Sequence, residues 1–306
     1  MDIHDFIIVG GGACGLTAGL YAARGGIKPL LLEKNAPGGQ LMLTDNIENY
    51  PGIDHINGFE LAQKMMQHAQ RFGLEIKYEG VEEVDLHDDY VVLKTKKGEY
   101  KAKYVLFSLG SSPRRLGIPG EDEYRGKGVS YCATCDGAFF KGKECVVLGG
   151  GNSALDEGIA LAEHASKVTI IHRREEFTAE QYLQDLAAKN EKISFIMNHE
   201  VKEIKGGEDG KVKSVILYDK GKEKEYDFPT QGVFVFVGYN PNSQLLENKV
   251  ELENGEVVVD QKMRSSNDRV YAGGDVRKDS VKQVIASCGD GAIAAVNILH
   301  KLRSEG

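Results

Sequence analysis

The feature of this chain that most restricts its fold is an internal repeat of one supersecondary pattern. Each copy has an apolar run of strand length, three consecutive glycines, a helical stretch and a second apolar run: DFIIVGGGACGLTAGLYAARGGIKPLLLEK (5–34) and ECVVLGGGNSALDEGIALAEHASKVTIIHRR (144–174). This order is that of a βαβ crossover, in which a helix returns the chain to a parallel strand. The sequence therefore predicts an α/β fold with two Rossmann-like, three-layer ββα nucleotide-binding domains.

Two stretches with several prolines and glycines divide the chain. They are SSPRRLGIPG (111–120) and GYNPNS (238–243), and such stretches are typical of linkers. We therefore expect an inserted domain at residues 114–241 that carries the second repeat. Residues 1–113 and 242–306 would then form a discontinuous first domain.

Composition excludes several classes of function. The 306 residues carry a net charge of −8, without the basic excess that binds nucleic acid or an anionic membrane surface. The longest uncharged stretch, 6–23, contains five glycines, which indicates a turn rather than a membrane-spanning helix. We also find no secretory leader before the first apolar run. We expect a cytoplasmic protein that binds neither nucleic acid nor membranes.

The first glycine turn fits the pattern G-x-G-x-x-G at Gly10, Gly12 and Gly15. The first two glycines permit a tight turn and the close approach of a pyrophosphate, and the third lets the helix pack on the strand. The second apolar run ends at Glu33, where a carboxylate can accept hydrogen bonds from the hydroxyls of an adenosine ribose. A glycine turn without a ligand is the alternative to this dinucleotide site.

The second turn fits the variant G-x-G-x-x-A at Gly149, Gly151 and Ala154. His172 and Glu33 both stand 23 residues after the first glycine of their turn, so the second copy has a basic triplet in place of the carboxylate: His172, Arg173 and Arg174. Guanidinium groups bind a 2′-phosphate, which a carboxylate would repel. The second turn therefore predicts an NADP site, and an exposed surface pair of arginines is the alternative.

Cys132 and Cys135 form a Cys-x-x-Cys pair in a chain with five cysteines. A zinc site would need a second close pair, and the other cysteines are scattered singly, at Cys14, Cys145 and Cys288. A permanent crosslink across two residues would constrain the unfolded chain little. A reversible redox pair remains, so we expect no metal. Asp136 follows the pair, either as an acid that exchanges protons with a sulfur or as a helix N-cap.

The cofactors follow from this chemistry. A nicotinamide donates a hydride, whereas a disulfide takes up two electrons, and a flavin can mediate between them. We therefore assign FAD to the first glycine turn and NADPH to the second.

Eight motifs occur in one order along the chain: GGGACG (10–15), GGQL (38–41), ENYPG (48–52), SPRRLGIPGE (112–121), CATCD (132–136), GGGNSA (149–154), HRR (172–174) and GGDV (273–276). Over essentially its whole length the chain resembles the low-molecular-weight, bacterial-type thioredoxin reductases. The resemblance implies that electrons pass from NADPH to FAD, then to the Cys132–Cys135 disulfide, and then to oxidised thioredoxin.

The resemblance also implies residue roles. Cys135 would lie against the flavin, Cys132 would attack the thioredoxin disulfide, and Asp136 would act as the acid. The implied FAD contacts are Gly39, Gln40, Asn49, Gly274, Asp275 and Gln283, and Asn152 and Ser153 join the NADPH site. A homodimer is implied as well, together with a rotation between the two domains.

Some positions depart from the family pattern. Thr178 stands where a further arginine is usual, Ser108 and Leu109 replace Ala-Thr, and Lys282 replaces arginine. Thr178 keeps open a related enzyme that uses ferredoxin or a deazaflavin as its donor. A dithiol oxidase of the same fold and a non-catalytic flavin-binding redox sensor are further alternatives.

Overall fold

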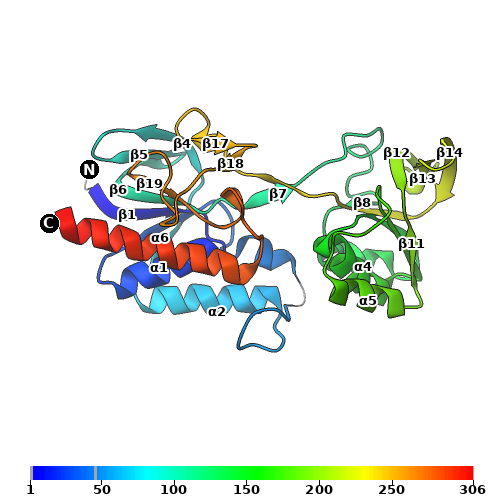
Figure 1. Ribbon diagram of the computed structural model, residues 1–306, viewed down its shortest axis with the longest axis horizontal. Coiled ribbons are helices and arrows are strands. Elements are labelled where there is room, and N and C mark those ends of the chain that lie inside the picture. The colour runs from blue at the N-terminus through cyan, green and yellow to red at the C-terminus, as the bar shows by residue number, and fades with distance from the viewer. Residues whose placement is uncertain (1–2, 45–46, 306) are drawn as a thin grey trace. The chain divides into compact units, whose positions relative to one another are not determined.

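The computed structural model describes residues 3–44 and 47–305, and the chain divides into two compact units. The first contains the residues up to Ser112 and those from Asn240 onward, and the second runs from Pro113 to Tyr239. The chain passes between the units in β7 (Ser111–Pro113), which is labelled in Figure 1, and in β16 (Tyr239–Pro241).

The first unit is built on a seven-stranded sheet with the order β3-β2-β1-β6-β5-β4, in which β19 also pairs with β6. β3, β2, β1, β6 and β19 are parallel, whereas β4 and β5 continue from β6 as antiparallel strands. The strands are β1 (Ile3–Val9), β2 (Leu30–Glu33), β3 (Glu75–Tyr78), β4 (Val81–Leu86), β5 (Val91–Thr95), β6 (Gly98–Phe107) and β19 (Val270–Ala272).

Both faces of this sheet are covered, which explains the uninterrupted apolar runs at residues 6–9 in β1 and 30–32 in β2. In β1 the buried side chains of Phe6 and Ile8 pack with the helices, and those of Ile7 and Val9 pack in the core on the other face. The helices are α1 (Ala13–Arg24), α2 (Gly58–Arg71) and α6 (Val284–Glu305), seen together below the sheet in Figure 1. Shorter elements are η1 (Gly39–Leu43), η3 (Gln244–Leu246), β17 (Leu252–Glu253), β18 (Glu256–Val257) and η4 (Gly274–Val276).

The second unit repeats this plan around a parallel five-stranded sheet with the order β11-β10-β9-β15-β8. Its strands are β8 (Val129–Ser130), β9 (Glu144–Gly149), β10 (Lys167–Ile171), β11 (Ile193–Ile196) and β15 (Gly232–Phe236). One face packs against α4 (Asn152–His164) and α5 (Gln181–Lys189). The other packs against the antiparallel sheet of β12 (His199–Gly206), β13 (Val212–Asp219) and β14 (Lys224–Pro229).

In both units the helices cover one face of the central sheet and a second core lies on the other face. The glycine turn joins β1 to α1 in the first unit and β9 to α4 in the second. The prediction of an α/β fold with two Rossmann-like domains is confirmed.

Candidate functional site

The first glycine turn has a backbone that only glycine can adopt. Gly10 has φ +103°, and a Cβ built on it would lie 2.4 Å from the carbonyl oxygen of Ser108. A Cβ on Gly15 would lie 2.0 Å from the carbonyl oxygen of Gly10, so the third glycine is needed where the helix crosses the strand. Gly12, at the start of α1, faces open space, with no atom within 4 Å of an added Cβ. This open helix N-terminus fits a dinucleotide pyrophosphate.

Glu33 lies at the end of β2 as its position in the sequence predicts, and its carboxylate also holds the turn. Its Oε2 accepts a hydrogen bond of 2.7 Å from the backbone N–H of Gly11, and its Oε1 accepts one of 2.8 Å from Asn35. The carboxylate is therefore fixed beside the turn.

Ser108, one of the departures from the family pattern, has a structural role in the same turn. Its buried hydroxyl lies 2.8 Å from the carbonyl oxygen of Gly10 and 3.2 Å from that of Val9, and can donate to either. The hydroxyl therefore offers a hydrogen-bond donor to the carbonyl oxygen of Gly10 in the turn.

A second group of predicted residues in this unit meets through Ser111. The Gln40 amide donates to the backbone oxygen of Ser111 at 2.8 Å, and the Ser111 hydroxyl donates to Asp275 Oδ2 at 3.4 Å. Burial raises the pKa of Asp275, while the nearby Lys282 ammonium acts in the opposite direction. A half-buried carboxyl of this kind is suited to bind hydroxyl groups of a ligand.

Asn49 and Gln283 are also brought together, although 234 residues separate them. The Asn49 amide donates to Gln283 Oε1 at 3.0 Å, one residue before α6 begins. Gly39 opens η1 with φ +56°, and a Cβ on it would lie 3.3 Å from the Cα of Gly12. The predicted FAD contacts therefore form two groups within one unit.

Gly274 and the adjacent Asp275 are held in place by an ion pair that the motifs do not predict. Asp290 on α6 is 4% exposed, accepts from the backbone N–H of Gly274 at 2.9 Å, and binds Arg277 at 2.7 and 3.1 Å. An acid in the otherwise uncharged stretch 284–299, 15 residues after Asp275, was the only signal in the sequence.

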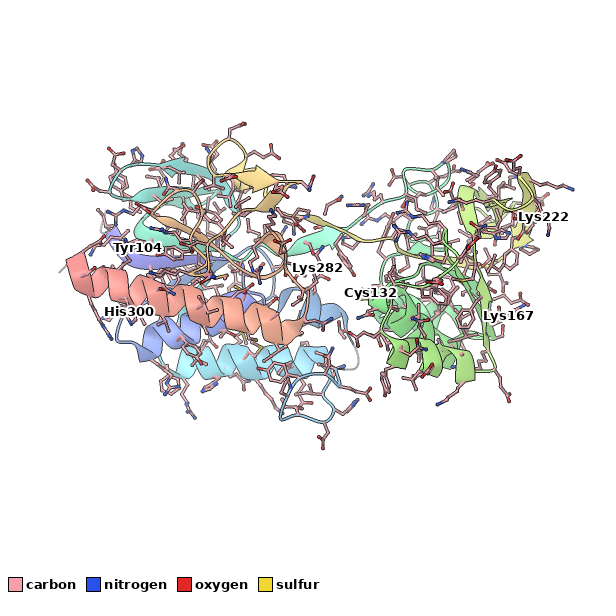
Figure 2. All side chains as sticks on the ribbon, viewed as in Figure 1. Tyr104, Cys132, Lys167, Lys222, Lys282 and His300 are labelled. Carbon is pink, nitrogen blue, oxygen red and sulfur yellow. A yellow bond between two sulfur atoms is a disulfide. The ribbon has the colours of Figure 1, made fainter. Side chains whose placement is uncertain are left out.

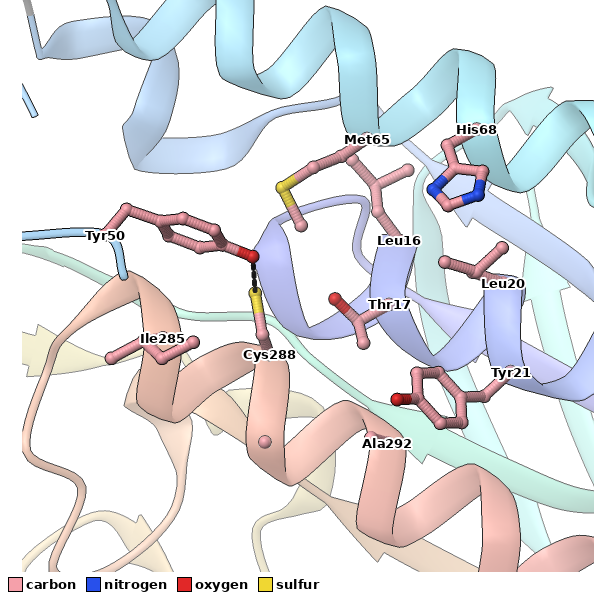
Figure 3. Close-up of a pocket in the computed structure, with 11 residues that line it drawn as sticks. Leu16, Thr17, Leu20, Tyr21, Tyr50, Met65, His68, Ile285, Cys288 and Ala292 are labelled. Carbon is pink, nitrogen blue, oxygen red and sulfur yellow. Dashed lines mark hydrogen bonds between the residues drawn. The ribbon is translucent and has the colours of Figure 1, made fainter. Parts of the chain in front are cut away.

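The first unit also contains a pocket of about 560 Å³ between α1, α2 and α6. Figure 3 shows Thr17 and Tyr21 of α1, His68 of α2 and Cys288 of α6 around it. The Tyr50 hydroxyl lies 4.0 Å from Cys288 Sγ, and burial raises the pKa of Tyr50. Cys288 and Cys14 are both buried.

The second glycine turn is constrained by different neighbours. Gly149 has φ +149°, and a Cβ on Gly150 would lie 2.3 Å from Nδ1 of His172. The carbonyl oxygen of Gly150 accepts hydrogen bonds from the backbone N–H groups of Thr178 and Ala179, at 2.8 and 3.1 Å, and from the Thr178 hydroxyl at 3.2 Å. Thr178 therefore stabilises the turn itself.

The three residues of the basic triplet differ in burial: the histidine is buried and the two arginines are exposed. His172 is 8% exposed, and its Nε2 has no hydrogen-bond partner among the described residues. Burial lowers the pKa of His172, and the nearby charges of Arg174 and Arg173 lower it further. Both arginines are exposed, and neither guanidinium group forms a hydrogen bond or ion pair with a described residue. Two free guanidinium groups and an orphaned imidazole nitrogen fit a phosphorylated nucleotide at this turn.

The start of α4 is fixed from outside the helix. Asn152 exchanges two hydrogen bonds with Glu180, its amide donating at 2.9 Å and its oxygen accepting from the Glu180 N–H at 2.7 Å. Ser153 is half-buried and Ala154 is buried. The methyl group of Ala154 would lie 2.8 Å from a Cβ on Gly149, so this close helix–strand contact requires glycine.

The redox pair lies in the second unit, where Cys132 is labelled in Figure 2. Cys132 and Cys135 form a disulfide with a Cα–Cα distance of 5.4 Å, at the start of the short helix α3 (Ala133–Asp136). Cys132 Sγ accepts the backbone N–H of Cys135 at 3.1 Å. Cys132 is only 9% exposed, whereas Cys135 is exposed.

Asp136 ends α3, and its side chain binds Ser130 instead of capping a helix. The Ser130 hydroxyl donates to Asp136 Oδ2 at 2.7 Å. The N-cap of α3 is Cys132, and the backbone N–H of Ala133 donates to Glu157 of α4 at 2.6 Å. The Asp136 side chain therefore does not act as an N-cap.

The part of the chain that the structure describes contains no cluster of three or more His, Cys, Asp or Glu side chains that could hold a metal ion. Within the same residues no helix has the length and apolarity needed to cross a membrane.

Comparison with known proteins gives a consistent result. The family model described as pyridine nucleotide-disulphide oxidoreductase matches residues 4–291. The chain is 45% identical over 299 residues to a thioredoxin reductase of Bacillus subtilis (strain 168), covering 97% of this chain and 94% of the relative. It is also 45% identical over 303 residues to one of Peptoclostridium litorale, with 96% of each chain covered.

Solved structures agree. A crystal structure of Lactococcus lactis thioredoxin reductase, titled as its FR conformation, superposes with a TM-score of 0.96 at 39% identity, covering 99% of this chain and 100% of that one. The thioredoxin reductase of T. acidophilum superposes with a TM-score of 0.93 at 37% identity, covering 98% of each chain.

Proposed function

Because this chain belongs to the pyridine nucleotide-disulphide oxidoreductase family, and within it to the thioredoxin reductases, we propose that it reduces the disulfide of a thioredoxin-like protein with electrons from NADPH. The observation that carries the proposal is the Cys132–Cys135 disulfide, with Asp136 beside it, in the same unit as a glycine turn followed by free arginines.

The first unit, residues up to 112 and from 240, is the FAD domain of this proposal. The turn of Gly10, Gly12 and Gly15 receives the pyrophosphate, and Glu33 the adenosine ribose. The remaining contacts come from Gly39, Gln40, Asn49, Gly274, Asp275 and Gln283. When bound, FAD supplies a carrier that accepts a hydride and passes two electrons to a disulfide.

The second unit, residues 113–239, is the NADPH domain. Gly149, Gly151, Asn152, Ser153 and Ala154 form the phosphate-binding turn and helix start. Arg173 and Arg174 bind the 2′-phosphate, and His172 packs beneath the turn. Thr178 donates to Gly150, so it holds the turn without adding a positive charge.

The exposure of the two sulfurs bears on their roles. The resemblance implies that Cys132 attacks the partner, but Cys132 is 9% exposed while Cys135 is exposed. Attack on a protein disulfide requires an accessible thiolate. We therefore assign the attack to Cys135 and the resolution of the mixed disulfide to Cys132, with Asp136 as the acid. A Cys132→Ser enzyme should then form a stable mixed disulfide with the partner, and Cys135→Ser should not.

The surface beside the disulfide fits a protein partner. Phe139, four residues after Cys135, is 74% exposed, and an aromatic ring in this position offers a large apolar contact.

We further propose a cytoplasmic homodimer that binds neither nucleic acid nor membranes. Tyr21, Ile285 and Ile293, exposed by 43, 44 and 40% on α1 and α6, offer an apolar face for a second copy.

The test has two steps: the absorbance spectrum of the purified protein is recorded with and without NADPH, and the rate of thioredoxin reduction is then measured. The yellow flavin absorbance should bleach anaerobically with NADPH, and oxidised thioredoxin should be reduced at a rate set by NADPH concentration. If neither NADPH nor NADH bleaches the flavin while reduced ferredoxin or a reduced deazaflavin does, the donor assignment is wrong. Peroxide release with a small dithiol and no nucleotide would identify a dithiol oxidase. A flavin that bleaches without turnover of any disulfide would identify a redox sensor.

A further inference from the structure

The hydroxyl of Ser130 lies between the redox disulfide and the acid. Ser130 is 4% exposed at the end of β8, an edge strand fixed by its pairing with β15. Its Oγ accepts the backbone N–H of Cys132 at 3.1 Å and lies 2.7 Å from Asp136 Oδ2 and 3.1 Å from the carbonyl oxygen of Cys132. A serine hydroxyl carries one proton, so it can donate to only one of these two acceptors at a time.

The two acceptors correspond to the two protonation states of Asp136. When the carboxyl is ionised, the shorter and charge-assisted bond is favoured, and the hydroxyl donates to Asp136. When the carboxyl holds a proton, it can donate to Ser130 Oγ, and the hydroxyl can turn to the carbonyl oxygen of Cys132. Neither state leaves a buried polar group without a partner, which would otherwise oppose one of the two states.

We propose that Ser130 is a positioning residue that holds Asp136 beside the disulfide and allows its carboxyl group to gain and lose a proton during thiol–disulfide exchange. This inference rests on the proposed function. Ser130 touches neither reacting sulfur in the contacts above, so it acts through Asp136 and the backbone of Cys132.

The proton balance of the exchange shows why both states are needed. The Cys135 thiol gives its proton to Asp136 and attacks the partner disulfide, forming a mixed disulfide and a partner thiolate that takes the proton from Asp136. Cys132 then loses its proton in the same way and displaces the second partner thiolate. Two electrons and two protons pass from the enzyme dithiol to the partner, and Asp136 ends ionised as it began.

The experiment uses full-length holoenzyme reduced by dithiothreitol, freed of excess reductant, and mixed in a stopped-flow instrument with either oxidised thioredoxin or the small disulfide 5,5′-dithiobis(2-nitrobenzoate). Ser130→Ala should slow the exchange by about 10- to 100-fold. Ser194→Ala is the matched control, because it removes another hydroxyl of the same unit, one that pairs with Thr169 at 3.1 Å. The control should exchange at the wild-type rate.

A double-mutant cycle separates positioning from a general structural effect. In an Asp136→Ala background, Ser130→Ala should change the rate by less than about 3-fold, because the group through which Ser130 acts is gone. Should Ser130→Ala not fold, Ser130→Gly replaces it in the cycle. An equal loss in both backgrounds, or a wild-type rate for Ser130→Ala, overturns the proposal.

The small disulfide separates this inference from the proposed function. If wild-type enzyme reduces 5,5′-dithiobis(2-nitrobenzoate) through Cys135 but no thioredoxin, the partner assignment fails while the cycle at Ser130 and Asp136 still gives its answer. If thioredoxin is reduced and the cycle is additive, only the inference about Ser130 fails.

Discussion

Replacing Asp290 by Asn should destabilise the first unit strongly, because it leaves Arg277 without its charged partner. The Asp290 and Arg277 side chains are 6 and 18% exposed, and their closest contact is 2.7 Å. Removing one member of a buried ion pair costs about 3 to 5 kcal/mol. Since Arg277 keeps a small exposed area and a bond to the Lys278 carbonyl, we expect the lower end, about 3 kcal/mol. The Asn side-chain oxygen can still accept the Gly274 N–H.

The assay is thermal unfolding of the holoprotein, followed by circular dichroism and by the rise in flavin fluorescence on release. For a unit of this size, about 3 kcal/mol corresponds to a fall in Tm of roughly 6 to 12 °C. The matched control is Asp268→Asn, since Asp268 also binds an arginine, Arg264, at 2.8 Å but is 77% exposed. An exposed pair contributes about 0 to 1 kcal/mol, so its Tm should hardly change.

A double variant tests whether the unpaired charge causes the loss, because it should be more stable than the single variant. Arg277→Met together with Asp290→Asn removes the unpaired charge and keeps the acceptor for Gly274. We expect it to be more stable than Asp290→Asn alone and within about 1 kcal/mol of the wild type. If the double variant is less stable than the single one, or if Asp290→Asn behaves like Asp268→Asn, the buried charge is not what fixes this turn.

Three further predictions concern the second unit. Arg173→Ala or Arg174→Ala should raise the Kd for NADPH by about 10- to 100-fold and change that for NADH by less than about 2-fold, and an equal loss for both nucleotides would exclude a 2′-phosphate contact. His172 has a pKa lowered by burial, so the unfolded state binds its proton more readily; stability is therefore present above about pH 6.5 and falls on acidification below it. His172→Gln should reduce the fall in unfolding free energy between pH 7.5 and pH 5.5, measured by urea titration at each pH. The same fall in the variant as in the wild type would refute this prediction. Phe139→Ala should raise the KM for thioredoxin by about 10-fold and leave reduction of 5,5′-dithiobis(2-nitrobenzoate) unchanged, whereas equal effects would place Phe139 outside the docking surface.

The parts of the site that the sequence predicts well are local. The two glycine turns, the strand ends at Glu33 and His172 and the Cys132–Cys135 pair are each specified by the spacing of a few residues. Apolar runs and glycine conformation act over the same short range, so the pattern alone is sufficient.

The parts that the sequence does not predict depend on contacts between distant segments. Ser108 meets Gly10 across 98 residues, and Ser111 meets Asp275 across 164. A serine within or just after a strand gives no sign of which carbonyl or carboxylate it will reach. The exposure of Cys135 and the burial of Cys132 also depend on how the chain around α3 packs, which the Cys-x-x-Cys spacing leaves open.

The two glycine turns show how one backbone geometry can serve two different charges. In the first unit a strand-end carboxylate can hold the turn directly, because Glu33 accepts the N–H of the middle glycine, Gly11. A carboxylate in that position would repel a 2′-phosphate, so the second unit cannot use the same contact. There the middle glycine, Gly150, is held through its carbonyl oxygen by Thr178 and Ala179, and a neutral imidazole packs beneath it. The basic strand end and the Thr178 contact are therefore linked: in place of a carboxylate that accepts the N–H of the middle glycine, the second turn has donors to the carbonyl oxygen of that glycine.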